Sequence, residues 1–216
     1  MGKIAHERLQ WFMYYFHSDY FKMILVTLIF SYLLGSIPTG YLLVKWTENR
    51  DIRKTGSGNI GATNVYRVKG LKYGVLVAFL DALKGFIPVI VSYELFNSLH
   101  LATFSGVASI YGHCFPLYLG FQGGKGVATA FGVYVALFPY VALGLLFIFL
   151  ATVFFTKYVS LASIIASIAG PIFLIPHTRS EEIAWLTISI AFLVIFQHRG
   201  NIKRLLTGNE KKIWRT

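Results

Sequence analysis

Long apolar stretches alternate along the chain with short segments rich in Gly, Lys and Arg. Each apolar stretch holds about 15–25 residues, close to the ~20 that a helix needs to cross a bilayer. The pattern therefore predicts an all-α, polytopic membrane protein with about seven transmembrane helices in a single domain, residues 22–200. The expected spans cover about residues 22–46, 71–95, 101–119, two halves of 126–155, 159–175 and 183–197.

The stretch 126–155 decides the number of spans, because about 30 residues are too many for one ordinary crossing. Pro139 lies near its middle and removes a helix hydrogen bond, so we divide the stretch there. A single kinked helix would instead give six spans. Pro176 is expected to end the sixth span for the same reason.

Lys and Arg counts give the orientation. Seven alternating spans place fifteen of the 20 basic residues on one face: in segment 45–72, which contains loop 47–70, in loop 120–126, near residue 157, and from Arg199 through the basic tail 201–216. By the positive-inside rule this face is cytoplasmic, with the N-terminus outside the cell and the C-terminus in the cytoplasm. Residues 1–21 lack the apolar centre and cleavage site of a signal peptide, and we expect an interfacial helix there.

Composition supports lipid as the solvent, because only 13% of residues are charged against roughly 25% in soluble domains. The net charge of +11 would suit nucleic acid, but the basic residues are confined to the ends of spans. Anionic lipid or a phosphorylated substrate fits that placement better, so no nucleic-acid partner is expected. The single cysteine, Cys114, excludes an internal disulfide, offers no metal cluster and is expected to be a core residue.

The first polar loop carries the sequence GSGNIGATN at residues 56–64, followed by Arg67. Three glycines in six residues allow the backbone to turn several N–H groups toward one point, which is how anions are held. Arg67 could add a two-pronged contact to phosphate. The alternative is a flexible connection between two helices.

A second loop, GFQGGKG at residues 120–126, precedes an apolar stretch. It lacks the spacing and the Ser or Thr after the lysine that a nucleotide phosphate loop requires. Glycine amides at a helix N-terminus and Lys125 could nevertheless bind a phosphate. A tight turn with a lysine reaching for the interface is the alternative.

The third polar segment, residues 198–210, follows the last span. His198 and Asn201 are three residues apart, so a continuing helix would place them on one side, where His198 could serve as a general base or donor. A basic tail that contacts anionic lipids is the alternative.

Polar residues within the spans are expected to have structural or mixed roles. Asp81 and Lys84 are expected to neutralise each other inside the second span. Ser160 and Ser163 either cap the sixth helix or offer hydroxyls to a substrate. Packing and backbone bonding are expected for Ser31, Ser36 and Thr39.

Together, the three motifs resemble the bacterial acyl-phosphate:glycerol-3-phosphate acyltransferase family from about Met23 onward. The resemblance implies transfer of a fatty acyl group from acyl phosphate to the 1-hydroxyl of glycerol 3-phosphate, without cofactor or metal, by a chain that can act as a monomer in the bilayer. It implies essential roles for Ser57, Arg67, His198 and Asn201, and a structural role for Glu210. The substrate-binding residues expected are Gly58, Asn59, Asn64, Gly123, Gly124, Lys125, Gly126 and Ser163.

The expected mechanism is direct attack of the hydroxyl on the acyl carbon, because phosphate is already a good leaving group and positioning and oxyanion stabilisation remain. The proton could pass to His198 or to a substrate phosphate. No histidine is followed by Asp in the His-x-x-x-x-Asp pattern of other acyltransferases. A transporter of a phosphorylated metabolite is the alternative function, and a scaffold for soluble partners is a third, which would not need glycine-rich amide loops.

Overall fold

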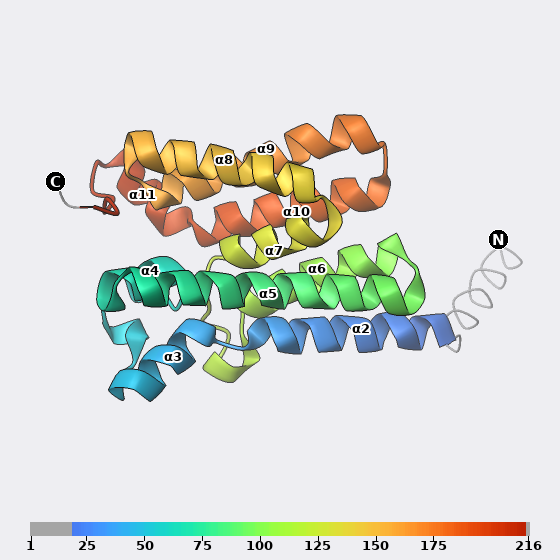
Figure 1. Ribbon diagram of the computed structural model, residues 1–216, viewed down its shortest axis with the longest axis horizontal. Helices are drawn as coiled ribbons and strands as arrows, with labels where there is room; N and C mark the ends of the chain where they lie inside the picture. The colour runs from blue at the N-terminus through green and yellow to red at the C-terminus, as the bar shows by residue number, and fades with distance from the viewer. Residues whose placement is uncertain (1–18, 215–216) are drawn as a thin grey trace, which may run out of the picture.

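The computed structural model describes residues 19–214, and every regular element in that range is a helix (Figure 1). The interfacial helix expected at residues 1–21 lies almost wholly outside this range. The longer helices run side by side along the long axis of the molecule, with α2, α5 and α6 in one half and α8, α9 and α10 in the other. The elements are α2 Asp19–Ser36, α3 Thr39–Glu48, η1 Ile52–Lys54, α4 Ala62–Lys69, α5 Leu71–Phe96, α6 Leu99–Cys114, η2 Leu117–Leu119, α7 Val127–Leu137, α8 Pro139–Thr156, α9 Val159–Thr178, α10 Glu181–Gln197 and α11 Arg199–Leu206.

Several of these helices are long and apolar enough to cross a membrane. In the described range there are four such segments, Phe21–Glu48, Leu71–Phe96, Pro139–Thr156 and Val159–Thr178, and a fifth if α10 and α11 are one span bent by 59°. Helix α7 has 11 residues, which at 1.5 Å per residue reach about 16 Å into a hydrocarbon core of ~30 Å. The expected count of seven crossings is therefore not established by helix length.

The prolines shape the helices differently from one another. The division at Pro139 is confirmed, because α7 ends at Leu137 and Pro139 opens α8, where its missing N–H costs nothing. The first span, expected to be continuous, is instead broken between α2 and α3, where Pro38 cannot donate and disfavours helical backbone before it. Pro176 does not end the sixth span, since α9 continues to Thr178. The third span is shorter than expected and ends at Cys114.

Small residues allow close helix packing between α2 and α6. A Cβ atom on Gly35 would lie 2.1 Å from the Ser109 carbonyl oxygen, and one on Gly112 would lie 2.2 Å from that of Tyr32. Such backbone contact is how helices associate where lipid supplies no hydrophobic drive. Cys114 is buried at the end of α6, as expected of a core residue.

The polar residues inside the spans are mostly paired as predicted. Lys84 Nζ lies 2.9 Å from Asp81 Oδ1, which confirms the expected ion pair. Ser31 and Ser36 each donate to the carbonyl four residues before them, also as expected. Thr39 differs, because its hydroxyl donates to the Asp81 carboxylate rather than to the backbone.

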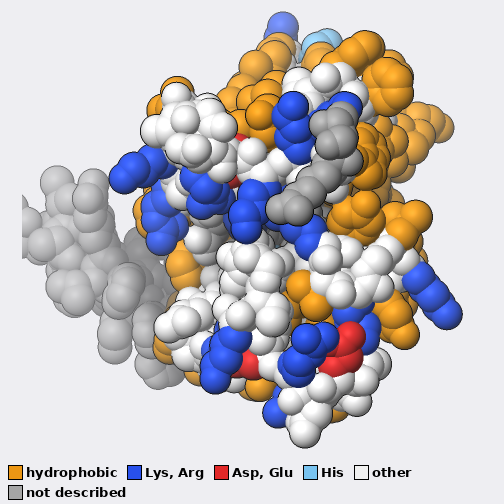
Figure 2. Space-filling view, turned by 90° about the vertical axis from the view of Figure 1, so that its left-hand side faces the viewer, with side chains coloured by type: hydrophobic (Ala, Val, Ile, Leu, Met, Phe, Trp, Pro, Cys, Tyr) orange, Lys and Arg blue, Asp and Glu red, His pale blue; other side chains and the backbone are white. Residues whose placement is uncertain are grey.

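Lys and Arg side chains gather at the end of the molecule where α3, α4 and α11 lie (Figure 2). The segment 47–70, expected to be a loop, contains η1 and α4 at this end. The expected boundary between residues 200 and 201 falls within α11, so the tail begins inside a short helix that follows α10 after a bend of 59°. This basic end is where the three polar motifs meet.

Candidate active site

A cavity of about 1610 Å³ opens at the basic end and extends between the helices. Its polar lining comes from all three motifs, which lie far apart in the sequence. Its apolar lining comes chiefly from α5, α7, α8 and α9. The predicted site residues that line it are Ser57, Asn59, Asn64, Arg67, Lys125, Ser163, His198, Asn201 and Glu210.

Asn64 organises the first motif. The Ser57 backbone N–H donates to Asn64 Oδ1 at 2.7 Å, and Asn64 Nδ2 donates to the Asn59 carbonyl at 2.8 Å. Gly56 has φ 63° and lies against Asn64 Oδ1, where a Cβ would approach to 2.1 Å. The predicted turn thus exists, although the third glycine, Gly61, has ordinary negative φ and serves as the N-cap of α4. Gly58 shapes the turn with φ 74° but does not line the cavity.

The second motif is a tight loop that leads into α7. Gly126 has φ 80° and forms the N-cap of that helix, as the sequence predicted. Asn59 Nδ2 donates to the Gly123 carbonyl at 3.4 Å, which links the first two motifs. Gly123, Gly124 and Gly126 lie behind Lys125 and do not themselves line the cavity.

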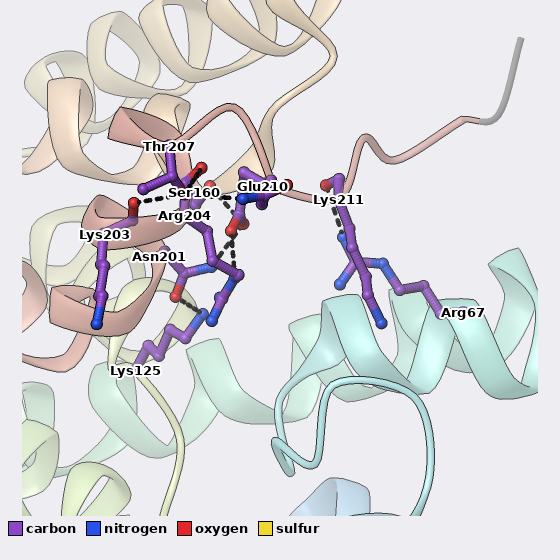
Figure 3. A network of polar contacts seen from close by, with 10 residues as sticks. Arg67, Lys125, Ser160, Asn201, Lys203, Arg204, Thr207, Glu210 and Lys211 are labelled. Atoms are coloured by element: carbon purple, nitrogen blue, oxygen red, sulfur yellow. Dashed lines mark hydrogen bonds and ion pairs between the residues drawn. The ribbon is translucent and has the colours of Figure 1, made fainter.

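A chain of hydrogen bonds joins the second motif to the third (Figure 3). Lys125 Nζ donates to Asn201 Oδ1 at 2.6 Å, and Asn201 Nδ2 donates to Glu210 Oε1 at 2.6 Å. Glu210 also accepts from Ser160 Oγ at 2.8 Å and from Arg204 Nε at 2.7 Å. The alternative of a lysine that reaches for the membrane interface is therefore wrong. The single Glu210 carboxylate thus links α9, α11 and, through Asn201, the Lys125 loop.

Arg67 points toward the same region from α4. Its guanidinium donates to the Lys211 backbone carbonyl at 3.2 Å (Figure 3). Burial lowers the pKa of Arg67, and the nearby Glu210 carboxylate counteracts part of that effect. Arg67 remains a cation with donors available to an anion, because its pKa starts far above neutrality.

The two serines of α9 have different roles. The capping alternative is wrong for both, because Tyr158 is the N-cap and has no side-chain cap bond. Ser160 donates to Glu210, while Ser163 donates to the Val159 carbonyl at 2.8 Å and faces the cavity. The bond between Ser160 and Glu210 was not expected. The two residues are 50 positions apart, so no local sequence pattern could pair them.

His198 and Asn201 do not lie on one continuing helix. The chain bends by 59° between α10 and α11, and His198 is both the C-cap of the first and the N-cap of the second. Both side chains nevertheless line the cavity. His198 Nδ1 lies 2.7 Å from the Val194 carbonyl oxygen, which only accepts, so Nδ1 carries a proton and Nε2 has the free lone pair.

Burial and neighbouring groups shift the pKa values of Lys125 and Glu210. Burial lowers the pKa of Lys125 to about 8; the Glu210 carboxylate opposes this shift, while Arg204 and Arg67 add to it. Burial would raise the pKa of Glu210, but hydrogen bonds from Asn201, Ser160 and Arg204 outweigh it and lower that pKa. The site thus has a carboxylate that is fixed as an anion and a lysine that titrates near physiological pH. Within residues 19–214, no cluster of three His, Cys, Asp or Glu side chains could hold a metal ion.

Four lining residues of the C-terminal segment were missed by the sequence analysis. Arg204 belongs to the Glu210 network, whereas the tail contributes Lys211, Ile213 and Trp214 to the cavity lining. The tail is held in place by a bond from the Ile213 N–H to the Lys157 carbonyl at 2.9 Å. No motif in the sequence pointed to the return of residues 211–214 across the site.

Comparisons with known proteins converge on one family. The family model described as glycerol-3-phosphate acyltransferase matches residues 25–208. A glycerol-3-phosphate acyltransferase of Aquifex aeolicus (strain VF5) is 48% identical over 87% of this chain and 98% of its own, and one of Geobacter sulfurreducens is 46% identical over 84% and 93%.

Solved structures agree with the sequence matches. The crystal structure of PlsY (YgiH), an integral membrane glycerol 3-phosphate acyltransferase, in its glycerol 3-phosphate form has a TM-score of 0.84 and 48% identity over 88% of this chain and 94% of its own. The lysophosphatidic acid form has a TM-score of 0.81 and 47% identity over the same shares. With its long apolar helices, the present chain is accordingly a multi-pass membrane protein.

Proposed function

The chain belongs to the glycerol-3-phosphate acyltransferase family, and we propose that it acylates the 1-hydroxyl of glycerol 3-phosphate with acyl phosphate as the donor. The products are lysophosphatidic acid and inorganic phosphate, at the first step of phospholipid synthesis. Neither a cofactor nor a metal ion is required, because the donor is already activated.

The observation that carries this proposal is a single cavity with two chemically distinct parts. One end holds cations and polar side chains, and the other is an apolar arm lined by residues such as Phe79, Leu146 and Leu150. Acyl phosphate has both properties, a phosphate head and a hydrocarbon chain. A transporter of a polar metabolite would not need the apolar arm.

Two phosphate groups must be held close together in this reaction. Arg67 and Lys125 approach the polar end from different elements, and Arg204 adds a third cation. Ser57 belongs to the first motif and lines the cavity, where its hydroxyl can donate to a phosphate oxygen. Asn59 binds the phosphate beside Ser57. Asn64 contributes by fixing the loop, because its side-chain amide is already bonded to the backbone.

The chemical step is direct attack. The substrate hydroxyl oxygen bonds to the acyl carbon, the bond from that carbon to the phosphate oxygen breaks, and phosphate leaves with the electron pair. His198 Nε2 is the ring nitrogen free to accept the hydroxyl proton, since Nδ1 is committed to Val194. The Asn201 amide has a second N–H beyond the one that is bonded to Glu210, and this N–H stabilises the oxyanion.

One assay tests the proposal. Purified protein receives palmitoyl phosphate and glycerol 3-phosphate, and phosphate release and lysophosphatidic acid are measured together. Product must form with acyl phosphate but not with palmitoyl-CoA; equal or better rates with the thioester would overturn the donor assignment. Recovery of an acylated serine after a quench with labelled acyl phosphate would refute direct attack.

For the topology we propose seven crossings with the N-terminus outside, in the bacterial inner membrane, and an active site that faces the cytoplasm. The gathering of Lys and Arg at the end that carries α11 supports this orientation. Because Cys114 is the single cysteine, a Cys114→Ala background allows one cysteine at a time to be placed. A cysteine at Lys203 should resist an impermeant maleimide in intact spheroplasts, whereas one at Arg179 should react; the reverse would refute the orientation.

We also propose that a monomer suffices, since the described residues of one chain supply the whole polar lining. Cross-linking or mass measurement in detergent, alongside turnover, tests this. Activity confined to a dimer fraction would contradict it.

A further inference from the structure

Three buried ionisable residues meet where α5 packs against α6, and one of them, Asp81, also lines the cavity. Asp81, Lys84 and His113 are each no more than 4% exposed. Lys84 Nζ pairs with Asp81 Oδ1, and His113 Nδ1 lies 3.7 Å from the same oxygen. Ionisable side chains within membrane helices are costly and are retained where they have a function. The chemical step above uses none of them.

One side of this cluster fixes the break in the first span. Lys84 Nζ donates to the Ile37 carbonyl at 2.8 Å, and the Thr39 hydroxyl donates to Asp81. The Ser109 hydroxyl on α6 donates to the Lys84 backbone carbonyl at 2.5 Å. The cluster thus ties α2, α3, α5 and α6 to one rigid point.

The other side of the cluster contacts the glycine loop, residues 120–126. The Gly124 N–H donates to the His113 carbonyl at 3.0 Å. A Cβ on Gly124 would lie 2.0 Å from His113 Nε2, and one on Gly123 would lie 2.3 Å from the His113 carbonyl oxygen. His113 therefore has one ring nitrogen toward Asp81 and the other against the loop, directly before Lys125.

His113 also has an unsatisfied polar atom. Within the described residues, its buried Nδ1 has no hydrogen-bond partner, and the Asp81 oxygen at 3.7 Å is beyond bonding range. A histidine that served only to fill space would be replaced by an apolar residue at lower cost. The arrangement makes sense if the ring must occupy one orientation between a fixed carboxylate and the loop.

We propose that His113, held by the Asp81–Lys84 pair, is a positioning residue that seats Gly123 and Gly124 so that Lys125 reaches Asn201 and the substrate phosphate. The proposal rests on the proposed function for the identity of that substrate, glycerol 3-phosphate. It also explains why both loop positions are glycine, since any side chain would strike His113.

Steric complementarity gives the sharpest test. His113→Ala, Gly124→Ala and the double variant are prepared together with Ser105→Ala. Ser105 is a matched control, because it bonds Ser92 in the same buried interface of α5 and α6, eight residues before His113. KM for glycerol 3-phosphate, kcat, and the Kd of glycerol 3-phosphate by calorimetry are measured for each protein in detergent.

His113→Ala should raise KM and Kd for glycerol 3-phosphate about tenfold while kcat changes less than about threefold, because the loop moves but the chemistry remains. Gly124→Ala should be worse, and the double variant should bind better than Gly124→Ala alone, because the added methyl then has room. Ser105→Ala should keep the wild-type KM. If Gly124→Ala fails to fold, His113→Phe still decides: it keeps a ring against Gly124 but loses the nitrogen toward Asp81, and it should bind more weakly than wild type.

Wild-type KM and Kd in both His113 variants would overturn the proposal, as would strictly additive effects of His113→Ala and Gly124→Ala. The calorimetric reading needs no turnover. A wild-type protein that binds glycerol 3-phosphate but transfers no acyl group would therefore refute the proposed function and leave the positioning role to be judged by Kd alone.

Discussion

Loss of the positive charge on Lys125 should lower enzymatic activity at alkaline pH. Burial lowers the pKa of Lys125 to about 8, so the ammonium form predominates at neutral pH and is lost as the pH rises through that value. Lys125 donates to Asn201 at 2.6 Å and lies at the polar end of the cavity, where a phosphate would bind. Only the charged form can stabilise that phosphate.

The size of the effect follows from the pKa. Because kcat/KM reports groups of the free enzyme, it should be level below about pH 7 and fall about tenfold per unit well above pH 8, reaching about one-eleventh of its plateau at pH 9. That loss is about 1.4 kcal/mol in apparent transition-state stabilisation. Phosphate monoesters have their second pKa at about 6, so glycerol 3-phosphate itself does not titrate in this window.

The assay is initial-rate phosphate release with palmitoyl phosphate between pH 6.5 and 9.5, corrected for spontaneous hydrolysis in enzyme-free blanks. Lys125→Arg is the matched variant, because a guanidinium stays protonated throughout this range. The plateau of kcat/KM in Lys125→Arg should be lower, since the planar guanidinium does not reproduce the lysine contact to Asn201. Its kcat/KM should nevertheless stay level up to pH 9.5. A level wild-type profile, or the same alkaline fall in Lys125→Arg, would refute the assignment.

Three further predictions concern other parts of the cavity. Arg67→Ala should lower kcat/KM by about 100-fold or more, through loss of a charged contact of ~1.5–3 kcal/mol and its bidentate geometry, while the protein still elutes as a folded species in size-exclusion chromatography; wild-type turnover would remove it from the site. Glu210→Gln should lower the thermal unfolding midpoint by several degrees, because an amide cannot accept from three converging donors, whereas the same change at exposed Glu181 should have little effect in the same fluorescence melt. Ser167→Phe should narrow the apolar arm and shift kcat/KM toward shorter acyl phosphates, with Ser167→Ala as the control; an unchanged chain-length profile would place the acyl chain elsewhere.

Local rules predicted much of the fold. The helix termini at Pro139 and Gly126, the buried Asp81–Lys84 pair and the glycine turn at residue 56 each depend on neighbours a few positions away. Proline marked a helix boundary at some positions but not at others. Pro139 and Pro38 separate helices, whereas Pro176 lies within α9, because one lost hydrogen bond near the end of a packed helix is tolerated.

The sequence by itself determined the class of the protein and the chemical types present at its site: apolar helices, a basic end, two glycine-rich loops and one histidine-containing segment. Only the tertiary structure decided which of these side chains meet. Ser160 and Asn201 converge on Glu210, Lys125 reaches Asn201 across 76 positions, and the tail returns over the cavity. His113 was passed over for the same reason, since its partners Asp81 and Gly124 lie on different segments. Periodicity and motif spacing record contacts within one helix or loop, while contacts between segments depend on helix packing, which no local pattern encodes.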